Sequence, residues 1–408
     1  MSYLVFCSSE IGALPFKIAK ALNDRGVNTY YISLSGKVSG HDSTEYHFGS
    51  KCEDWDLSHM FSDFFCLPHK IDQVFYLPHK IINRLRIIKN RYHITHCFAT
   101  GIKSYLLKRA DIRYKYWSYG SDLDRHCFHP VFLSSYPLWV RPLLYLSFIS
   151  VIRRNARRSI CHSDSIMIAP YQTESLKRIY VNKKLFFLPH LIEVSDYEVL
   201  MQQKTESKSK VCKEIFAKHF FFSSSRHEWT GYFKNEPDLK GNDIILKAFE
   251  KYLSKSNNYD TKLIMIEKGT DSEASKSLAR KLKISKYIFW IREMPRSEIQ
   301  QFYQGATMCF GQFGTPVITY AALEPLANGN ICASFYGKDT LNVPFYNEMP
   351  PIFNSKDPDE IANFMCEITS NNNLYSDLCY NSWKWTKKNC SEKRFVRSFQ
   401  EVFEVVRN

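Results

Sequence analysis

Short runs of β-branched and aromatic residues alternate with segments of helical periodicity along most of the chain. The run 219–223 is apolar and too short for a helix, whereas 242–253 repeats its apolar residues at helical spacing. Strands that alternate with helices in this way are typical of βαβ units, which build parallel sheets. The pattern therefore predicts an α/β fold.

The alternation forms two series. The first contains a helix at 11–25 and strands at 3–8, 28–34, 93–99, 113–118, 165–169 and 184–188. The second contains strands at 219–223, 262–266, 287–291, 307–311 and 330–334, with helices at 242–253, 272–282 and 297–304. Two doubly wound domains in tandem explain both series.

A polar stretch at 202–210 separates the two series, and we interpret it as a linker or as the entry to a helix. We therefore predict an N-terminal Rossmann-like domain over 1–200 and a C-terminal one over 211–390. Beyond 334 the pattern is helical. An apolar stripe marks the last segment, 391–408, which is expected to pack on an apolar surface. Its members are Phe395, Phe399, Val402, Phe403 and Val406.

Composition adds a strong positive charge. The 408 residues include 55 Lys and Arg against 41 Asp and Glu, a formal net charge of +14, and 15% are aromatic. So many aromatic residues indicate an ordered globular chain. The charge favours a phosphate-rich partner, whether nucleotide, nucleic acid or anionic membrane, without choosing among them.

The 12 cysteines are scattered singly, without a CxxC pair or a Cys-His cluster at zinc spacing, so no structural metal site is expected. Cys7, Cys97, Cys309 and Cys332 lie in predicted strands, where a thiol acts as a small apolar side chain. Scattered thiols suit a reducing compartment, and no basic segment precedes the first apolar run. We expect a cytoplasmic protein without a signal peptide.

The segment 139–158 joins the most apolar window of the chain to a basic cluster. Its apolar run, 142–152, is shorter than the ~20 residues that span a bilayer. The basic residues that follow are Arg153, Arg154, Arg157 and Arg158. This pattern fits a helix lying on an anionic membrane, such as the inner face of the plasma membrane. It equally fits a core helix with a solvated basic end.

The most informative stretch is 306–334, which predicts a strand, a glycine-rich turn, a helix start and another strand. Gly311 and Gly314 allow the backbone to come close to a ligand, and amides at the following helix N-terminus favour a phosphate. Glu324 is expected near the same turn and therefore near the same ligand. Alternatively, this stretch is an ordinary crossover whose glutamate faces solvent.

This stretch resembles the donor-binding domain of retaining nucleotide-sugar glycosyltransferases with the GT-B fold, the group 1 or family 4-like enzymes. The segment 321–329 is similar to the second half of the family's Glu-x7-Glu element, so the resemblance gives Glu324 the ribose-binding role of the second glutamate. Pro316 stands where the first glutamate would contact the donor sugar. Where a subgroup of the family has Asp-Gln, this chain has Gly311-Gln312, so Gln312 matches and Gly311 departs.

Two upstream segments resemble the family's Arg and Lys-Gly elements, which hold the donor diphosphate. Arg226 lies in Ser-Arg-His-Glu-Trp, and Lys240 lies in Asp-Leu-Lys-Gly-Asn. Negative charge grows on a leaving diphosphate in the transition state, and fixed cations stabilise it. The resemblance therefore implies that Arg226 and Lys240 are catalytic. Alternatively, they are a surface arginine and a lysine at a helix entry.

The resemblance extends to the N-terminal domain. Gly12 follows the first strand, where the family's glycine lets acceptor and diphosphate approach, so the implied donor-binding set is Gly12, Gln312, Gly314 and Glu324. On the acceptor side, Gly120 and Asp122 match the family's His-Gly-Ser-Asp-like turn, with Tyr119 in place of the histidine. His190 lies near the cleft in this register, although a lone histidine after proline is also a common structural cap.

The resemblance implies GT-B architecture: two Rossmann-like domains, a deep interdomain cleft and a C-terminal helix that crosses back to the first domain. It implies transfer of a sugar, with retention of configuration, from a nucleoside diphosphate donor to a lipid-linked or polysaccharide acceptor, as in bacterial lipopolysaccharide or capsule synthesis. Neither metal nor other cofactor is expected, because the cationic side chains would neutralise the diphosphate.

Two alternatives remain. A nucleotide-sugar epimerase or phosphorylase would share the fold, and a non-catalytic glycan-assembly protein would explain the missing first glutamate. Nucleic-acid binding is disfavoured, because the basic residues are spread along the chain rather than gathered with stacking aromatics.

Overall fold

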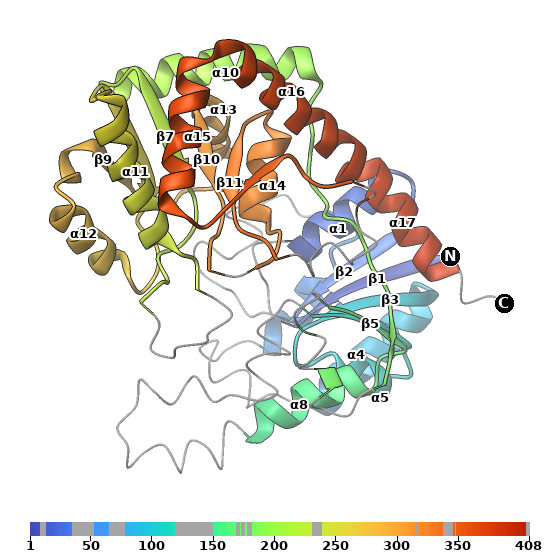
Figure 1. Ribbon diagram of the computed structural model, residues 1–408. Helices are drawn as coiled ribbons and strands as arrows, with labels where there is room; N and C mark the ends of the chain where they lie inside the picture. The colour runs from blue at the N-terminus through green and yellow to red at the C-terminus, as the bar shows by residue number, and fades with distance from the viewer. Residues whose placement is uncertain are drawn as a thin grey trace, which may run out of the picture. The chain divides into compact units, whose positions relative to one another are not determined.

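The computed structural model describes residues 1–8, 14–34, 53–64, 78–118, 150–168, 172, 176–177, 182–230, 239–314, 316–337, 346 and 348–404. They fall into two compact units, one within 1–188 and 396–408 and the other within 189–395 (Figure 1). Each unit is built on a sheet in which six strands are described, and all neighbouring strands run parallel.

The first sheet has the order β2-β1-β3-β4-β5-β6. Its strands are β1 (Ser2–Cys7), β2 (Thr29–Ser33), β3 (Ile94–Thr100), β4 (Lys115–Trp117), β5 (Ser165–Met167) and β6 (Lys184–Leu185). The helical elements of this unit include α1 (Leu14–Asn23), the short 3-10 helix η1 (Ser58–Phe64), α4 (Pro78–Arg91), α5 (Tyr105–Arg109) and α8 (Ser150–Cys161). The strand order reverses between β1 and β3, which is the topological switch point of this sheet.

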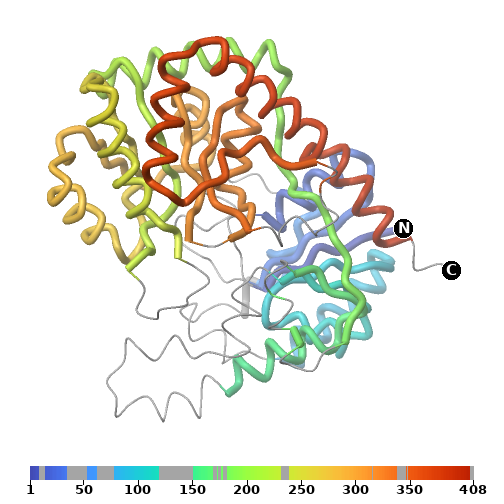
Figure 2. The backbone as a smooth tube through the Cα atoms, in the orientation of Figure 1, coloured from blue at the N-terminus to red at the C-terminus, as the bar shows by residue number. Residues whose placement is uncertain are grey.

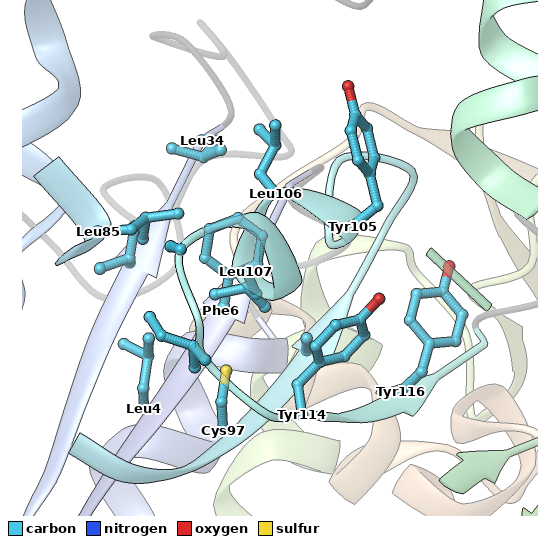
Figure 3. Packing of buried hydrophobic residues seen from close by; sticks show 14 of the residues in the cluster. Leu4, Phe6, Leu34, Leu85, Cys97, Tyr105, Leu106, Leu107, Tyr114 and Tyr116 are labelled. Atoms are coloured by element: carbon cyan, nitrogen blue, oxygen red, sulfur yellow. The ribbon is translucent and has the colours of Figure 1, made fainter. Parts of the chain in front are cut away.

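The core of the first unit lies between its sheet and the helices α4 and α5. Leu4 and Phe6 of β1 lie in one apolar cluster with Leu85 of α4 and Leu107 of α5 (Figure 3). Burying a side chain of this size contributes about 1.5–3 kcal/mol. Because residues two apart on a strand share a face, β1 presents Leu4 and Phe6 to these helices and Tyr3 to the opposite side.

The last helix, α17 (Glu392–Glu404), covers that opposite side. Phe399 and Phe403 are buried, and their rings lie 5.6 and 5.7 Å from the ring of Tyr3. Phe395 is buried as well, and Val402 is half-buried. This confirms the predicted packing for the described members of the apolar stripe, whereas Val406 lies outside the described residues. The helix from residue 396 onward accordingly belongs to the first unit (Figure 2).

The second sheet has the order β12-β11-β10-β7-β8-β9. Its strands are β7 (His219–Ser223), β8 (Thr261–Ile266), β9 (Ile288–Ile291), β10 (Met308–Phe310), β11 (Cys332–Ser334) and β12 (Ile352–Asn354). The helical elements include α10 (Tyr197–Glu214), α11 (Asn242–Ser256), α12 (Ser272–Lys281), η5 (Ser285–Tyr287), α13 (Arg296–Gly305), α14 (Tyr320–Ala327), α15 (Pro358–Ser370) and α16 (Asn372–Asn389). The chain moves from β7 to β8 and β9 on one side and then to β10 on the other, so the switch point lies between β7 and β10.

The prediction of a linker or helix entry at 202–210 is wrong, because these residues lie inside the 18-residue helix α10. Gln, Lys and Glu are good helix formers, so a polar composition did not exclude a helix here. The helix is held by buried Leu200 and Val211 and by Lys204, whose Nζ donates to the carbonyl oxygen of Gly329 at 2.5 Å. The strand β12 was not predicted, because its three residues follow two prolines and give no clear pattern.

Part of the predicted membrane segment is described. Residues 139–149 lie outside the described residues, and α8 begins at Ser150. Ile152, Ala156 and Ile160 are buried in the cluster of the first unit, while Arg154 and Arg158 are exposed. This part is therefore a core-packed helix with a basic outer side. Across the described ranges, no helix combines the length and the apolar content needed to cross a bilayer.

Candidate functional site

Several predicted site residues gather at the switch point of the second sheet. β7 and β10 are neighbours, with Ser223 opposite Phe310. Arg226 follows the carboxyl end of β7, and Gln312 and Gly314 follow that of β10. In open α/β sheets, ligands bind outside the carboxyl ends of the strands at such a point.

Hydrogen bonds fix three segments to one another here. Ser225 Oγ donates to the carbonyl of Gly311 at 3.1 Å, and the Asn242 side-chain amide donates to the carbonyl of Ser225 at 3.3 Å. The backbone amide of Phe313 donates to the carbonyl of Lys240 at 3.0 Å. The segment after β7, the entry to α11 and the turn after β10 therefore form one rigid edge.

Lys240 is the more buried of the two predicted cations. Its side chain is buried, and Nζ donates to Gln312 Oε1 at 3.3 Å, so two predicted residues from different elements are in contact. The backbone amide of Lys240 donates to the carbonyl of Glu228 at 2.6 Å. An ammonium group held at a sheet edge in this way suits a phosphate oxygen.

Two glycines allow this close approach. A Cβ at Gly314 would lie 2.2 Å from the carbonyl oxygen of Leu239, and one at Gly241 would lie 2.8 Å from Cβ of Phe313. Gly241 also has a φ of +71°, a conformation that favours glycine. It is the N-cap of α11, and no side chain caps the helix there. The amino end of α11 thus lies against the turn that carries Gln312.

The absence of the subgroup's aspartate has a steric explanation. A Cβ at Gly311 would lie 2.6 Å from Ser334 Oγ and 3.0 Å from Cβ of Ala322. No side chain fits at 311 unless β11 and α14 move. At Pro316 the carboxylate is also missing, and the carbonyl of this proline accepts a hydrogen bond from the amide of Gly337 at 3.1 Å.

Arg226 occupies a more open position than Lys240. Its side chain is 42% exposed, and its Nε lies 3.0 Å from Glu228 Oε2. The guanidinium is thus held by an exposed ion pair, which contributes little stability and can rearrange at small cost. Arg226 can turn toward a ligand without loss of a buried contact.

Glu324 is part of a network that the sequence did not reveal. Its Oε1 forms an ion pair with Arg296 at the start of α13, and the Tyr303 hydroxyl lies 3.0 Å from Oε2 and 2.7 Å from Ser224 Oγ. Because a carboxylate only accepts, the tyrosine donates to Glu324 and the serine donates to the tyrosine. Each carboxylate oxygen keeps a second lone pair for a hydroxyl group. Arg296 and Tyr303 were missed because neither lies near Glu324 in sequence; their spacing of two helical turns was the available signal.

A second unpredicted cluster fixes the segment after Arg226. His227 is fully buried, and its Nε2 lies 3.1 Å from the carbonyl oxygen of Ile266, to which it must donate. Ser275 Oγ lies 2.8 Å from Nδ1 and accepts from Trp229 Nε1 at 2.7 Å, so the serine proton goes to the histidine. Burial lowers the pKa of His227 from 6.5 to about 4, which keeps the ring neutral.

The remaining predicted residues have different placements. His190 lies in the second unit, half-buried, with Nδ1 hydrogen-bonded to the Tyr346 hydroxyl and its ring 5.0 Å from that of Tyr320. Burial lowers the pKa of His190 to about 4. Gly12, Gly120 and Asp122 lie outside the described residues. Within the described ranges, no three His, Cys, Asp or Glu side chains are grouped to hold a metal ion.

No protein-family model and no curated protein sequence matches the chain. Among solved structures, it is similar to a glycosyltransferase from Rickettsia africae ESF-5, with 14% identity and a TM-score of 0.60 over 100% of this chain and 99% of that one. It is also similar to HepE of Anabaena in complex with UDP-glucose, with 11% identity and a TM-score of 0.61 over 99% and 100% of the two chains. A third is WaaG, a glycosyltransferase involved in lipopolysaccharide biosynthesis, with 10% identity and a TM-score of 0.56 over the full length of both chains.

These likenesses cover both units and are to GT-B enzymes. Together with the two parallel sheets, they show that the chain has the two-domain α/β GT-B fold, as the sequence predicted.

Proposed function

We propose that the chain is a glycosyltransferase that moves a sugar from a nucleoside diphosphate donor to a hydroxyl group. The observation that carries this proposal is the contact between Lys240 and Gln312 at the switch point of the second sheet. The likeness to HepE, which was crystallised with UDP-glucose, and to other glycosyltransferases supports the donor class.

The donor diphosphate would bind beside Lys240, at the amino end of α11. As the bond to the sugar breaks, negative charge grows on the diphosphate, and a buried ammonium group stabilises it more than one in water would. Arg226 would turn from Glu228 to the second phosphate. Glu324 would accept hydrogen bonds from the ribose hydroxyls while Arg296 and Tyr303 hold its carboxylate in place.

We further propose transfer with retention of configuration and without a protein nucleophile. Neither Gly311 nor Pro316 carries a carboxylate near the expected position of the donor sugar. In such a reaction the diphosphate leaves from the face of the sugar that the acceptor hydroxyl attacks. An oxygen of the leaving diphosphate can then take the proton of that hydroxyl, provided that the site aligns the two substrates. A lipid-linked or polysaccharide acceptor, as in bacterial surface glycan synthesis, is the acceptor class that we propose, and the likeness to WaaG supports it.

The test compares Lys240→Ala and Arg226→Ala with Lys247→Ala, whose lysine is exposed on α11, the helix that follows Lys240, and is paired with Asp243. Release of nucleoside diphosphate is measured with a panel of nucleotide sugars, with and without glycan acceptors. We expect Lys240→Ala to lower the rate by about 100-fold or more and Arg226→Ala to lower it less, with Lys247→Ala unchanged. Wild-type rates in both site variants would overturn the assignment.

The missing carboxylate at Pro316 also favours a second candidate, a non-catalytic protein that binds a nucleotide sugar. The same assay separates the two. Donor binding by the wild-type chain without release of nucleoside diphosphate, across all acceptors tried, would support the non-catalytic candidate. An NMR spectrum of the product would show which anomer forms and so tests retention.

A further inference from the structure

Three aromatic side chains are exposed along the edge of the second sheet where β7, β8 and β9 begin. Phe216 is 90% exposed, Tyr259 is 53% exposed and Phe289 is 44% exposed. They come from the segments 213–218, 257–262 and 283–289, which together we call the basic-aromatic edge. Exposed aromatic residues that gather in one place mark an interaction surface.

Hydrogen bonds and ring contacts join the three segments. The amide of Lys218 donates to the carbonyl of Asp260 at 3.0 Å, and the ring of Tyr259 lies 5.7 Å from that of Tyr287. Phe289 is the second residue of β9, the edge strand of the sheet. The exposed aromatics therefore belong to one continuous surface.

The surface is positively charged. It carries five lysines, and its acidic residues are Glu214 and Asp260. The lysines are Lys213, Lys218, Lys262, Lys283 and Lys286. Two of them lie over the Tyr287 ring, with Nζ of Lys262 at 5.4 Å and Nζ of Lys286 at 4.9 Å from its centroid. These two ammonium groups lie over the ring, and Lys262 Nζ also donates to the carbonyl of Lys286 at 2.7 Å. The other three lysines of the edge are exposed to solvent.

Phe216 combines a left-handed backbone conformation with an almost fully exposed apolar side chain. Both features are unfavourable for an unbound chain, and a partner at this surface would explain why they occur together. It follows the C-cap of α10 with a φ of 51°, at a position where glycine is preferred. The amide of the next residue, Ala217, donates to the carbonyl of Cys212 at 3.1 Å, so the turn is held by hydrogen bonds. A strained backbone thus presents an almost fully exposed phenyl ring at the tip of a turn.

We propose that the basic-aromatic edge binds an anionic membrane surface. A phenyl ring exposed at the tip of a turn can enter the boundary between headgroups and acyl chains, and tyrosines favour the same depth. The surrounding lysines would then face anionic headgroups. A nucleic acid would instead require aromatic rings arranged as a stacking platform in a groove, whereas Phe216 projects from a turn. This surface differs from the segment 139–158, and the proposal does not depend on glycosyl transfer.

The test is sedimentation of the full chain with vesicles. The vesicles are of phosphatidylcholine alone or of phosphatidylcholine with about one third phosphatidylglycerol. We expect binding to the anionic vesicles only, and weaker binding at high salt. Phe216→Ser and the double variant K218Q/K286Q should each weaken binding about tenfold.

Matched controls lie on the first unit. Ile87→Ser replaces an apolar side chain on α4 that is 57% exposed, and K80Q/K108Q removes two exposed lysines. Both should bind as the wild type does. A Phe216→Trp variant adds a direct readout, since brominated lipids should quench its fluorescence more strongly than that of the wild type.

Three results would overturn the proposal. The wild-type chain could fail to bind anionic vesicles, or the edge variants could bind as tightly as the wild type, which would place the contact elsewhere. Binding of a single-stranded RNA oligonucleotide that depends on Phe216, without binding to vesicles, would assign the edge to nucleic acid instead.

Discussion

At the scale of the residue, the candidate site depends on polar side chains whose partners lie far away in sequence. Lys240 meets Gln312, and Glu324 meets Arg296 and Tyr303. The motif order could predict the first pair, because the resemblance assigns both residues to the binding of one donor. It could not predict the second group, because the spacing of Arg296 and Tyr303 places them on one face of a helix without indicating that Glu324 of another helix lies against that face.

The first prediction concerns Arg296. Its replacement by Ala removes the cation beside Glu324, a carboxylate whose side chain is only 16% exposed. We expect a loss of about 1–3 kcal/mol in the free energy of unfolding and a higher KM for the donor. Arg280→Ala, at an exposed position on α12, is the control. Urea unfolding and donor titration check both effects, and an unchanged KM would remove Arg296 from the donor site.

The second prediction concerns acid stability. Because the pKa of His227 is about 4 in the folded chain and 6.5 as its ordinary value, the unfolded chain binds the extra proton first. His227 therefore costs no stability above pH 6.5, and the free energy of unfolding falls by roughly 3 kcal/mol as the pH drops from there toward 4.

The measurement is urea unfolding of the wild type and of His227→Gln between these pH values. The variant should be less stable at neutral pH but should lose less on acidification. His79→Gln, at an exposed position on α4, should follow the wild-type curve. Parallel curves for the wild type and His227→Gln would contradict the assigned neutral ring.

At the scale of the element, apolar runs predicted the strands well, whereas polar composition led to a wrong prediction for the helix α10. β7 has the predicted bounds, 219–223, because its apolar run is buried on both faces. Cys7, Cys97, Cys309 and Cys332 are buried in strands as predicted. The helix α10 was missed because its stability comes from contacts with α13 and with the turn after α14, such as those of Ser207 with Gln304 and of Lys204 with Gly329. Tertiary contacts of this kind leave only a weak periodic pattern.

The third prediction concerns α10. Lys204→Ala removes the donor to the Gly329 carbonyl, which then lies buried without this partner. We expect a loss of about 1–3 kcal/mol in the free energy of unfolding. Lys210→Ala, at an exposed position on the same helix, should change it by less than about 0.5 kcal/mol. Equal urea midpoints for the two variants would show that the buried lysine does not anchor the helix.

At the scale of the whole molecule, the alternation of strands and helices and the order of several weak motifs were sufficient to predict the GT-B fold. Each motif alone was ambiguous, but their order along the chain matches the order in which β7, α11, β10 and α14 follow one another. The site was less predictable: Gly311 departs from the expected aspartate because Ser334 fills the space, which only the fold reveals. Net charge indicated an anionic partner without locating it.

The central claim, a nucleotide-sugar site at the switch point of the second sheet, is tested most directly by thermal melting with nucleotides. UDP, GDP, CDP, ADP and matching nucleotide sugars are compared on the wild type, Lys240→Ala and Lys247→Ala. We predict that nucleotides of one base raise the melting midpoint of the wild type and of Lys247→Ala, and that Lys240→Ala loses most of this shift. No shift with any nucleotide at millimolar concentration, or an equal shift in Lys240→Ala, would contradict the claim.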